Sequence, residues 1–177
     1  MAEQHKWVVD TAHSSMDFSI KHMVVATVKG TFRNFDAAIE ADPEDLTTAN
    51  IEFTVDVASI DTRNEDRDNH LRSADFFDVE KYPEMTFRSH KIVKKSEGEY
   101  EVTGALTIHG ITRPETFLVT YEGQARDPEG NVKAGFSGHG TINRSEYGLT
   151  WNAALEAGGV MVGDQVKISV DIEATRA

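Results

Sequence analysis

The sequence predicts an all-β protein made of antiparallel strands. Apolar and polar residues alternate along most of the chain with a period of two, as in the run VKISVDIE at residues 166–173, and this period is typical of strands rather than helices. Each such strand has one dry and one wet face, which favours an antiparallel sheet. Turn-forming sequences separate the strands, as at residues 95–98 and 127–131, because Pro presets φ and Gly or Asn accepts a left-handed backbone.

The alternation marks eight or nine strands, joined by mostly short connections. We expect them near residues 15–22, 24–32, 35–42, 51–57, 85–92, 100–109, 117–121, 132–142 and 166–173. An antiparallel domain with this many strands forms a sandwich or a closed barrel, and the alternation alone is compatible with both. A barrel of eight strands is the size whose interior either fills with side chains or holds one small ligand.

One stretch departs from the strand pattern. Thr62 is followed three residues later by Glu65, which is the form of a capping box, and predicts a short surface helix over residues 64–73. The run DTRNEDRDNH at residues 61–70 has only a superficial likeness to a calcium loop, because the glycine at the sixth position and the final glutamate are missing. We interpret it as the solvated surface of that helix, with internal Arg–Asp pairs.

Residues 73–77 follow this helix and include two adjacent aromatic rings. We expect a second helical turn here that tucks Phe76 and Phe77 inward. The two rings either close the core or line the mouth of a cavity.

The charge balance excludes several classes of partner. The 177 residues carry 18 Lys and Arg against 30 Asp and Glu, a net charge of −12. Sequence-independent binding of nucleic acid or of an anionic membrane surface needs concentrated Lys and Arg, so we expect neither. There is no Cys, which removes disulfides, thiolate metal sites and cysteine nucleophiles. With no linker and no internal repeat, the chain is predicted to be a single domain over residues 1–177.

Apolar runs are short throughout. With glycine set aside, none exceeds the four residues 23–26, which is too short for a transmembrane helix or for the apolar region of a secretion signal. We therefore expect a cytoplasmic protein without stable membrane insertion.

Motifs for catalysis are missing from the sequence, which contains no G-x-S-x-G elbow, Walker loop or H-E-x-x-H. Asp10, His13 and Ser14 supply the residue types of a hydrolase triad, but triad members usually come from distant parts of a chain. We interpret these three residues as a cap at the start of the first long strand. The seven histidines are scattered, without metal-ligand spacing, and no metal site is predicted from them.

His22 is the histidine with the most informative position. The alternation places it on the same face as Phe18 and Ile20. Three interpretations stay open: a neutral histidine satisfied by a backbone partner, a polar contact for a bound ligand, and an axial ligand for a haem.

Several sequence segments together resemble the signature of the YceI-like proteins, over residues 7–173. They are Asp10 with His13 and Ser14, Gly30 with Phe32 and Phe35, residues 59–62, 67–73 and 75–79 with Pro83, residues 104–110 with Thr112, and Arg144 with Tyr147 and Gly148. The resemblance implies an eight-stranded antiparallel lipocalin-like barrel with a short helix near one opening. It also implies non-catalytic binding, storage or transport of a long-chain isoprenoid or similar amphiphilic lipid in an elongated apolar channel. Many members are periplasmic, whereas we expect this chain to be cytoplasmic, and dimeric members favour a homodimer.

With such a barrel, the alternation provides candidate ligand-binding residues. The side chains expected to face the channel are Phe18, Ile20, His22, Phe53, Val55, Phe87, Leu106, Ile108, Phe117 and Phe136, with Phe76, Phe77 and Trp151 at its mouth. Small inward residues would leave room for a guest: Ala37, Gly104, Ala134, Gly138 and Gly140. In a filled barrel the same large residues would be core.

We expect no required cofactor and a bound isoprenoid or other long-chain lipid. The acidic chain favours a neutral or weakly anionic head group, as in a quinone, a prenyl compound or a fatty amide, because a pyrophosphate would need Arg or Lys. The alternatives are a haem- or metal-binding barrel that uses a histidine such as His22, and an enzyme that acts on a lipid.

Overall fold

The computed structural model describes residues 4–23, 25–152 and 162–177. The strands are β1 (His5–Val9), β2 (Ser15–His22), β3 (Ala26–Phe32), β4 (Phe35–Asp42), β5 (Asp45–Asp56), β6 (Ile60–Asp61), β7 (Glu84–Ser96), β8 (Glu99–Ile108), β9 (Ile111–Arg126), β10 (Val132–Asn143) and β11 (Val162–Arg176). The helices are α1 (Glu65–Arg72) and the 3₁₀ turns η1 (Thr11–His13), η2 (Val57–Ser59) and η3 (Arg144–Tyr147).

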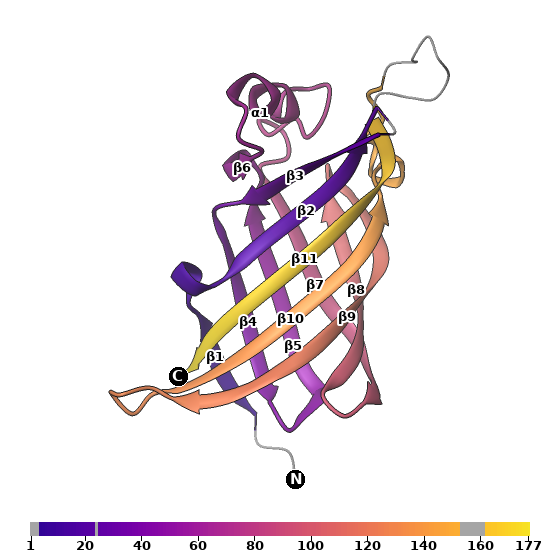
Figure 1. Ribbon diagram of the computed structural model, residues 1–177. Helices are drawn as coiled ribbons and strands as arrows, with labels where there is room; N and C mark the ends of the chain where they lie inside the picture. The colour runs from indigo at the N-terminus through magenta and orange to yellow at the C-terminus, as the bar shows by residue number, and fades with distance from the viewer. Residues whose placement is uncertain (1–3, 24, 153–161) are drawn as a thin grey trace.

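All of these strands belong to one antiparallel sheet that closes on itself (Figure 1). Closure comes from β1, which pairs with β4 on one side and with the end of β11 on the other. Three barrel strands are each interrupted once: β1 continues as β2, β3 as β4, and β5 as β6. The result is a closed eight-stranded barrel, as the resemblance implied, and the sandwich alternative is wrong.

The first interruption, between β1 and β2, explains the group Asp10, His13 and Ser14. The carboxylate of Asp10 caps η1 by accepting from the backbone N–H of Ala12 at 3.1 Å and lies 2.7 Å from His13 Nδ1. The hydroxyl of Ser14 accepts from the backbone N–H of Glu173 at 3.0 Å and is directed to the backbone of β11. Asp10 therefore caps η1, directly before β2, and Ser14 ties the start of β2 to β11.

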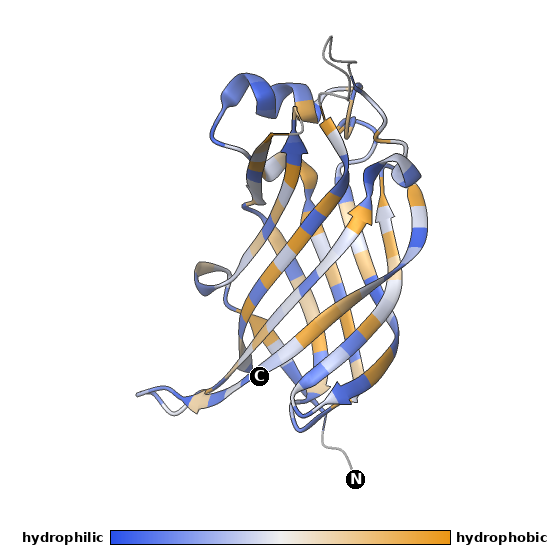
Figure 2. Cartoon of the chain, turned by 45° about the vertical axis from the view of Figure 1, so that its right-hand side comes forward, coloured by the Kyte–Doolittle hydropathy of each residue, from blue (hydrophilic) through white to orange (hydrophobic). Residues whose placement is uncertain are grey.

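The period-two pattern places apolar side chains inside the barrel. Orange and blue residues alternate along the strands in Figure 2. At the end that holds the N-terminus, the interior is well packed: Trp7 is 3% exposed and Leu46 is 1% exposed, and the Trp7 indole donates to the carbonyl of Ala41 at 3.1 Å.

Helix α1 covers the opposite opening of the barrel, beside β6 (Figure 1). The predicted helix is present, but its cap is not Thr62: the side chain of Asn64 caps it by accepting from the backbone N–H of Arg67 at 3.0 Å. Thr62 instead binds Asp68. Its backbone N–H and its hydroxyl both donate to Asp68 Oδ1, at 2.9 and 2.5 Å. A buried Thr62–Asp68 pair is the stronger arrangement here, because a buried carboxylate must be satisfied.

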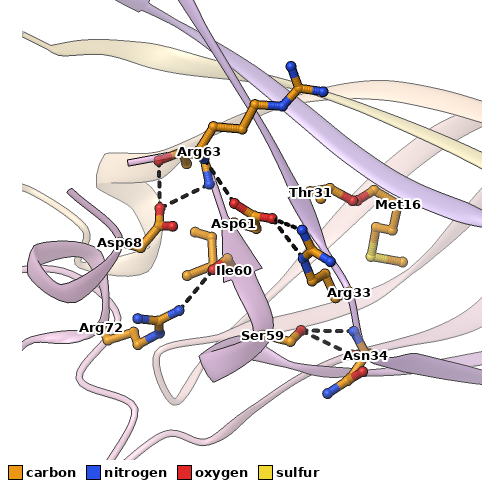
Figure 3. A network of polar contacts seen from close by, with 11 residues as sticks. Met16, Thr31, Arg33, Asn34, Ser59, Ile60, Asp61, Arg63, Asp68 and Arg72 are labelled. Carbon is orange, nitrogen blue, oxygen red and sulfur yellow. Dashed lines mark hydrogen bonds and ion pairs between the residues drawn. The ribbon is translucent and has the colours of Figure 1, made fainter. Parts of the chain in front are cut away.

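The expected Arg–Asp pairs within the helix are wrong. Asp68 is only 6% exposed, and the helix uses its charged side chains to hold η2 and β6. Arg72 donates to the carbonyls of Ala58 and Ile60 at 2.8 and 3.0 Å, and Asp61 at the end of β6 is bound by Arg33 (Figure 3).

The expected second helical turn is also wrong. Residues 74–77 form hydrogen-bonded turns instead, in which the backbone N–H of Phe76 donates to Ser73 and that of Phe77 to Leu71, each at 3.0 Å. Both rings nevertheless point inward, and Phe76 is 8% exposed.

Among the helices of the described residues, none is long and apolar enough to cross a membrane.

Candidate ligand-binding cavity

A large cavity lies inside the barrel at the α1 end. Its volume is about 530 Å³, within the range of about 300–1,000 Å³ that is usual for small-molecule sites. Strands β2, β3 and β11 supply one wall, and α1 with the turn after it supplies another. The lining from this second wall includes Arg67, His70, Leu71, Phe76 and Phe77.

A second, smaller cavity continues deeper into the barrel. It has a volume of about 130 Å³, and its lining is apolar except for Thr86 and Ser137. At its far side the lining includes Ala41 and Leu46, which are each 1% exposed. The interior is therefore an upper cavity of about 530 Å³, at the α1 end, above a lower cavity of about 130 Å³.

Every ligand-binding candidate predicted from the sequence lines one of these two cavities. The upper cavity is lined by Phe18, Ile20, His22, Phe76, Phe77, Ile108 and Trp151. The lower cavity is lined by Phe53, Val55, Phe87, Leu106, Phe117 and Phe136. Their role in ligand binding stays a prediction, but their placement follows from the period of the strands.

Two of the small inward residues do not leave free space. A Cβ at Gly104 would lie 2.6 Å from the ring of Phe87, and a Cβ at Gly140 would lie 2.6 Å from the ring of Phe117. These two rings pack edge to face with their centroids 5.3 Å apart. Aromatic rings therefore fill the room that we expected a guest to take at these two glycines.

At the mouth, two rings from α1 and the turn after it meet a third, Trp151, from far along the chain. His70 lies edge-on to Trp151 and to Phe76, with centroid separations of 4.8 and 5.1 Å, and its Nε2 is 2.9 Å from Asp75 Oδ2. Phe76 and Trp151 thus line the mouth, and they also bury the inner side of α1.

The mouth also depends on Arg144, a residue that the pattern analysis did not assign to the site. Its side chain is 4% exposed and donates to four backbone carbonyls, those of Leu149, Trp151, Val162 and Gly163, at 2.7 to 3.3 Å. Burial lowers the pKa of its guanidinium below the ordinary value. Arg144 therefore holds the chain on both sides of residues 153–161, which lie outside the described part of the structure. Only its presence in the YceI-like signature marked it in the sequence.

Charges of both signs surround the upper cavity. Lys21 and Arg67 lie in its lining together with Asp17 and Asp66. Arg67 is partly engaged, because its guanidinium donates to the hydroxyl and to the carbonyl of Thr62, each at 2.7 Å. Among the described residues, the lining thus offers no concentrated cluster of cations for a multiply charged anion.

One group of possible metal ligands lies outside the cavities. Asp10, His13 and Glu173 offer three ligand atoms within 4.8 Å of one another, on the outer surface where β1 bends into β2. They already pair among themselves: His13 Nδ1 is 2.7 Å from Asp10 and 3.3 Å from Glu173. The hydrogen bond that the His13 imidazole donates to the Asp10 carboxylate raises the pKa of His13, which favours a protonated imidazole over a metal-binding one.

Comparison with known proteins identifies relatives over almost the whole chain. The model of the YceI-like domain matches residues 7–174. A UPF0312 protein of Staphylococcus epidermidis is 47% identical over 169 residues, which cover 95% of this chain and 96% of the relative. A UPF0312 protein of Staphylococcus aureus is 47% identical over 165 residues, covering 93% and 94%.

Solved structures share the fold. The crystal structure of Burkholderia cenocepacia BcnA has a TM-score of 0.83 at 29% identity and covers 94% of this chain and 99% of that one. The Campylobacter jejuni YCEI protein has a TM-score of 0.75 at 33% identity, covering 89% and 90%. A polyisoprenoid binding domain from Saccharophagus degradans has a TM-score of 0.74 at 12% identity, covering 98% and 99%, a likeness of fold alone.

Proposed function

Because the chain belongs to the YceI-like family, we propose that its barrel binds a long-chain isoprenoid or a similar amphiphilic lipid, for storage or transport and without catalysis. The observation that carries the proposal is the upper cavity: about 530 Å³ of space inside a closed barrel, walled mostly by apolar side chains. The name of the Saccharophagus degradans domain, polyisoprenoid binding, agrees with this ligand class.

The energetics favour such a guest. Burial of one methylene group contributes about 0.8 kcal/mol, so twenty buried carbon atoms contribute roughly 16 kcal/mol. Association and ordering cost about 4–15 kcal/mol. The apolar chain can therefore supply the affinity by itself, and the head group need only orient the guest.

The polar head lies at the α1 end in this proposal. Asn64, Asp66, Arg67 and Lys21 are in the cavity lining there, whereas the lower cavity ends among apolar side chains. Since the cations at the mouth are balanced by carboxylates, the head group is neutral or weakly anionic. A prenyl pyrophosphate would leave most of its charge without partners.

Native mass spectrometry of the protein purified from its host, followed by extraction of bound small molecules, tests the ligand class. We expect a co-purifying lipid with a long apolar chain and a neutral or weakly anionic head. Recovery of an intact prenyl pyrophosphate would overturn the head-group assignment. An intense absorption band from haem in the same sample would favour the alternative in which His22 is an axial ligand.

A pair of variants tests whether the lipid lies inside the barrel. Ile20 lines the upper cavity, and its neighbour Ser19 lies in a groove on the outer face. We expect Ile20→Trp to abolish lipid retention and Ser19→Trp to preserve it. Equal retention by both variants would show that the lipid is not held in the upper cavity.

Two further expectations from the sequence stay predictions. Light scattering of the purified protein tests the homodimer, and cell fractionation tests the cytoplasmic location.

A further inference from the structure

Three side chains lie at the boundary between the two cavities. Met16, Met85 and Ile168 are in the lining of both the upper and the lower cavity. They come from different parts of the barrel: Met16 is on β2 and Ile168 on the adjacent β11, and Met85 is on β7, three barrel strands away from β2. The two thioethers therefore approach the lumen from well-separated walls and narrow it at one level.

The two kinds of side chain at this constriction differ in mobility. Ile168 is β-branched and stiff at χ1, so it is a fixed part of the wall. Methionine is unbranched, has three rotatable bonds and adapts to irregular apolar space. Met16 and Met85 are 8% and 9% exposed, and no charge or hydrogen bond has to be broken for either side chain to turn aside.

The sizes of the two cavities determine how the constriction affects a bound chain. The upper cavity alone is large enough for a ligand, whereas about 130 Å³ is close to the roughly 150 Å³ of a dry apolar cavity that accepts one benzene ring. The lower cavity therefore holds only the end of a chain. A guest that extends from the upper cavity reaches it by passing between the two methionines.

We propose that Met16 and Met85 determine the length of apolar chain that the barrel accepts. A guest that fits within the upper cavity binds with both methionines in place, and a longer guest gains the lower cavity only by displacing them. This inference rests on the proposed lipid-binding function and adds chain-length selection to it.

The experiment measures dissociation constants for two prenyl alcohols, one of three and one of nine isoprene units, supplied from cyclodextrin. Native mass spectrometry reports binding to the wild-type protein and to Met16→Ala/Met85→Ala. Each additional buried methylene strengthens binding by roughly fourfold. We expect the double variant to bind the nine-unit alcohol at least about tenfold more tightly than wild type, with the three-unit alcohol changed less than about twofold.

A matched control and a second variant separate the outcomes. Met23 is 44% exposed, so Met23→Ala is the same chemical change away from the boundary and should alter neither constant. Should the double alanine variant not fold, Met16→Leu/Met85→Leu keeps the side-chain volume but removes one rotatable bond from each residue. We expect it to weaken binding of the nine-unit alcohol by at least about threefold and to leave the three-unit alcohol unchanged.

Variants that change both constants by the same factor, or neither, would overturn the role of the two methionines while leaving lipid binding intact. Failure of the wild-type protein to bind either alcohol would instead overturn the proposed function, and this inference with it.

Discussion

Replacing Gly104 with alanine tests how closely β7 and β8 approach each other beside Phe87, whose ring lines the lower cavity. A Cβ at this position would lie 2.3 Å from the carbonyl oxygen of Arg88 and 2.6 Å from the ring of Phe87. The neighbouring register of β7 shifts between Ser89 and Lys91, and a glycine at such an irregularity often marks close backbone approach. The added methyl group must therefore push apart two hydrogen-bonded strands or turn a buried ring.

The size of the effect follows from the contacts. Extra atoms in a packed core cost about 1–3 kcal/mol, and here the nearest atom is backbone, which cannot rotate away. We expect Gly104→Ala to lower the free energy of unfolding by about 3 kcal/mol.

Gly138 provides the matched control. It lies in the wall of the lower cavity, but a Cβ there would meet Val119 Cγ2 at 3.6 Å and the carbonyl oxygen of Leu118 at 3.8 Å, both ordinary contacts. Since alanine also restricts the unfolded chain, Gly138→Ala should be neutral or stabilising by about 0.4–1 kcal/mol.

Urea unfolding measures both changes, with tryptophan fluorescence and far-ultraviolet circular dichroism as probes. The m-value should stay constant, because the surface exposed on unfolding does not change. A Gly104→Ala variant within about 0.5 kcal/mol of wild type would refute the steric argument, and so would equal losses in both variants.

Three further changes have definite expected results. Arg144→Met removes four hydrogen bonds to carbonyls but also relieves the desolvation of a buried cation. Urea unfolding should therefore show that the free energy of unfolding falls by about 3 kcal/mol. The control Arg113→Gln, at an exposed ion pair, should lower it by less than about 1 kcal/mol. Burial raises the pKa of the Glu115 carboxyl, so the folded state favours its protonated form. The contribution of that proton to the free energy of unfolding is therefore lost as pH rises through the folded-state pKa. Glu115→Gln should therefore be more stable than wild type at pH 8 and equal to it near pH 4 in thermal unfolding, and a gain that is independent of pH would contradict this reasoning. Leu106→Trp fills the lower cavity and should weaken binding of a nine-unit prenyl alcohol while sparing a three-unit one, as measured by native mass spectrometry; unchanged binding of the longer alcohol would remove Leu106 from the path of the chain.

The inward faces of the barrel were predictable because strand geometry repeats every two residues. Phe18 and Ile20 on β2 reached the upper cavity, and Phe53 and Val55 on β5 reached the lower one, without any knowledge of which strands are neighbours. Closure into a barrel could not be predicted from this alternation, because it depends on the pairing of β1 with β11, whose residues are more than 160 positions apart.

Local capping was harder to predict than strand faces. Thr62 and Asn64 both have side chains that cap helices well, and the sequence pattern favoured Thr62. The structure uses Asn64, because Thr62 is needed by the buried Asp68. Burial of Asp68 is a tertiary effect, and a charged residue on a helix of such polar composition gives no local sign of it.

The constriction in the lumen could not be predicted from the sequence for a similar reason. Met16 and Met85 each follow the alternation of their own strands, which shows only that they point inward. That they meet the lumen at the same level depends on the stagger of the barrel, which is set by the register of all eight barrel strands together.

The difference between the two ends of the barrel follows from where its strands stop. β5 pairs with β7 from Glu84 onward, while β6 turns away to pair with β3, so above Glu84 the wall continues as α1 and residues 73–83. The helix is held to residues 58–62 by side-chain hydrogen bonds such as those of Arg72 and Asp68 rather than by a strand ladder. A wall segment held by side-chain contacts opens at lower cost than a continuous sheet. For the proposed lipid, we therefore expect entry through the α1 end, apolar tail first, and this direction leaves the polar head beside the charged side chains of the mouth.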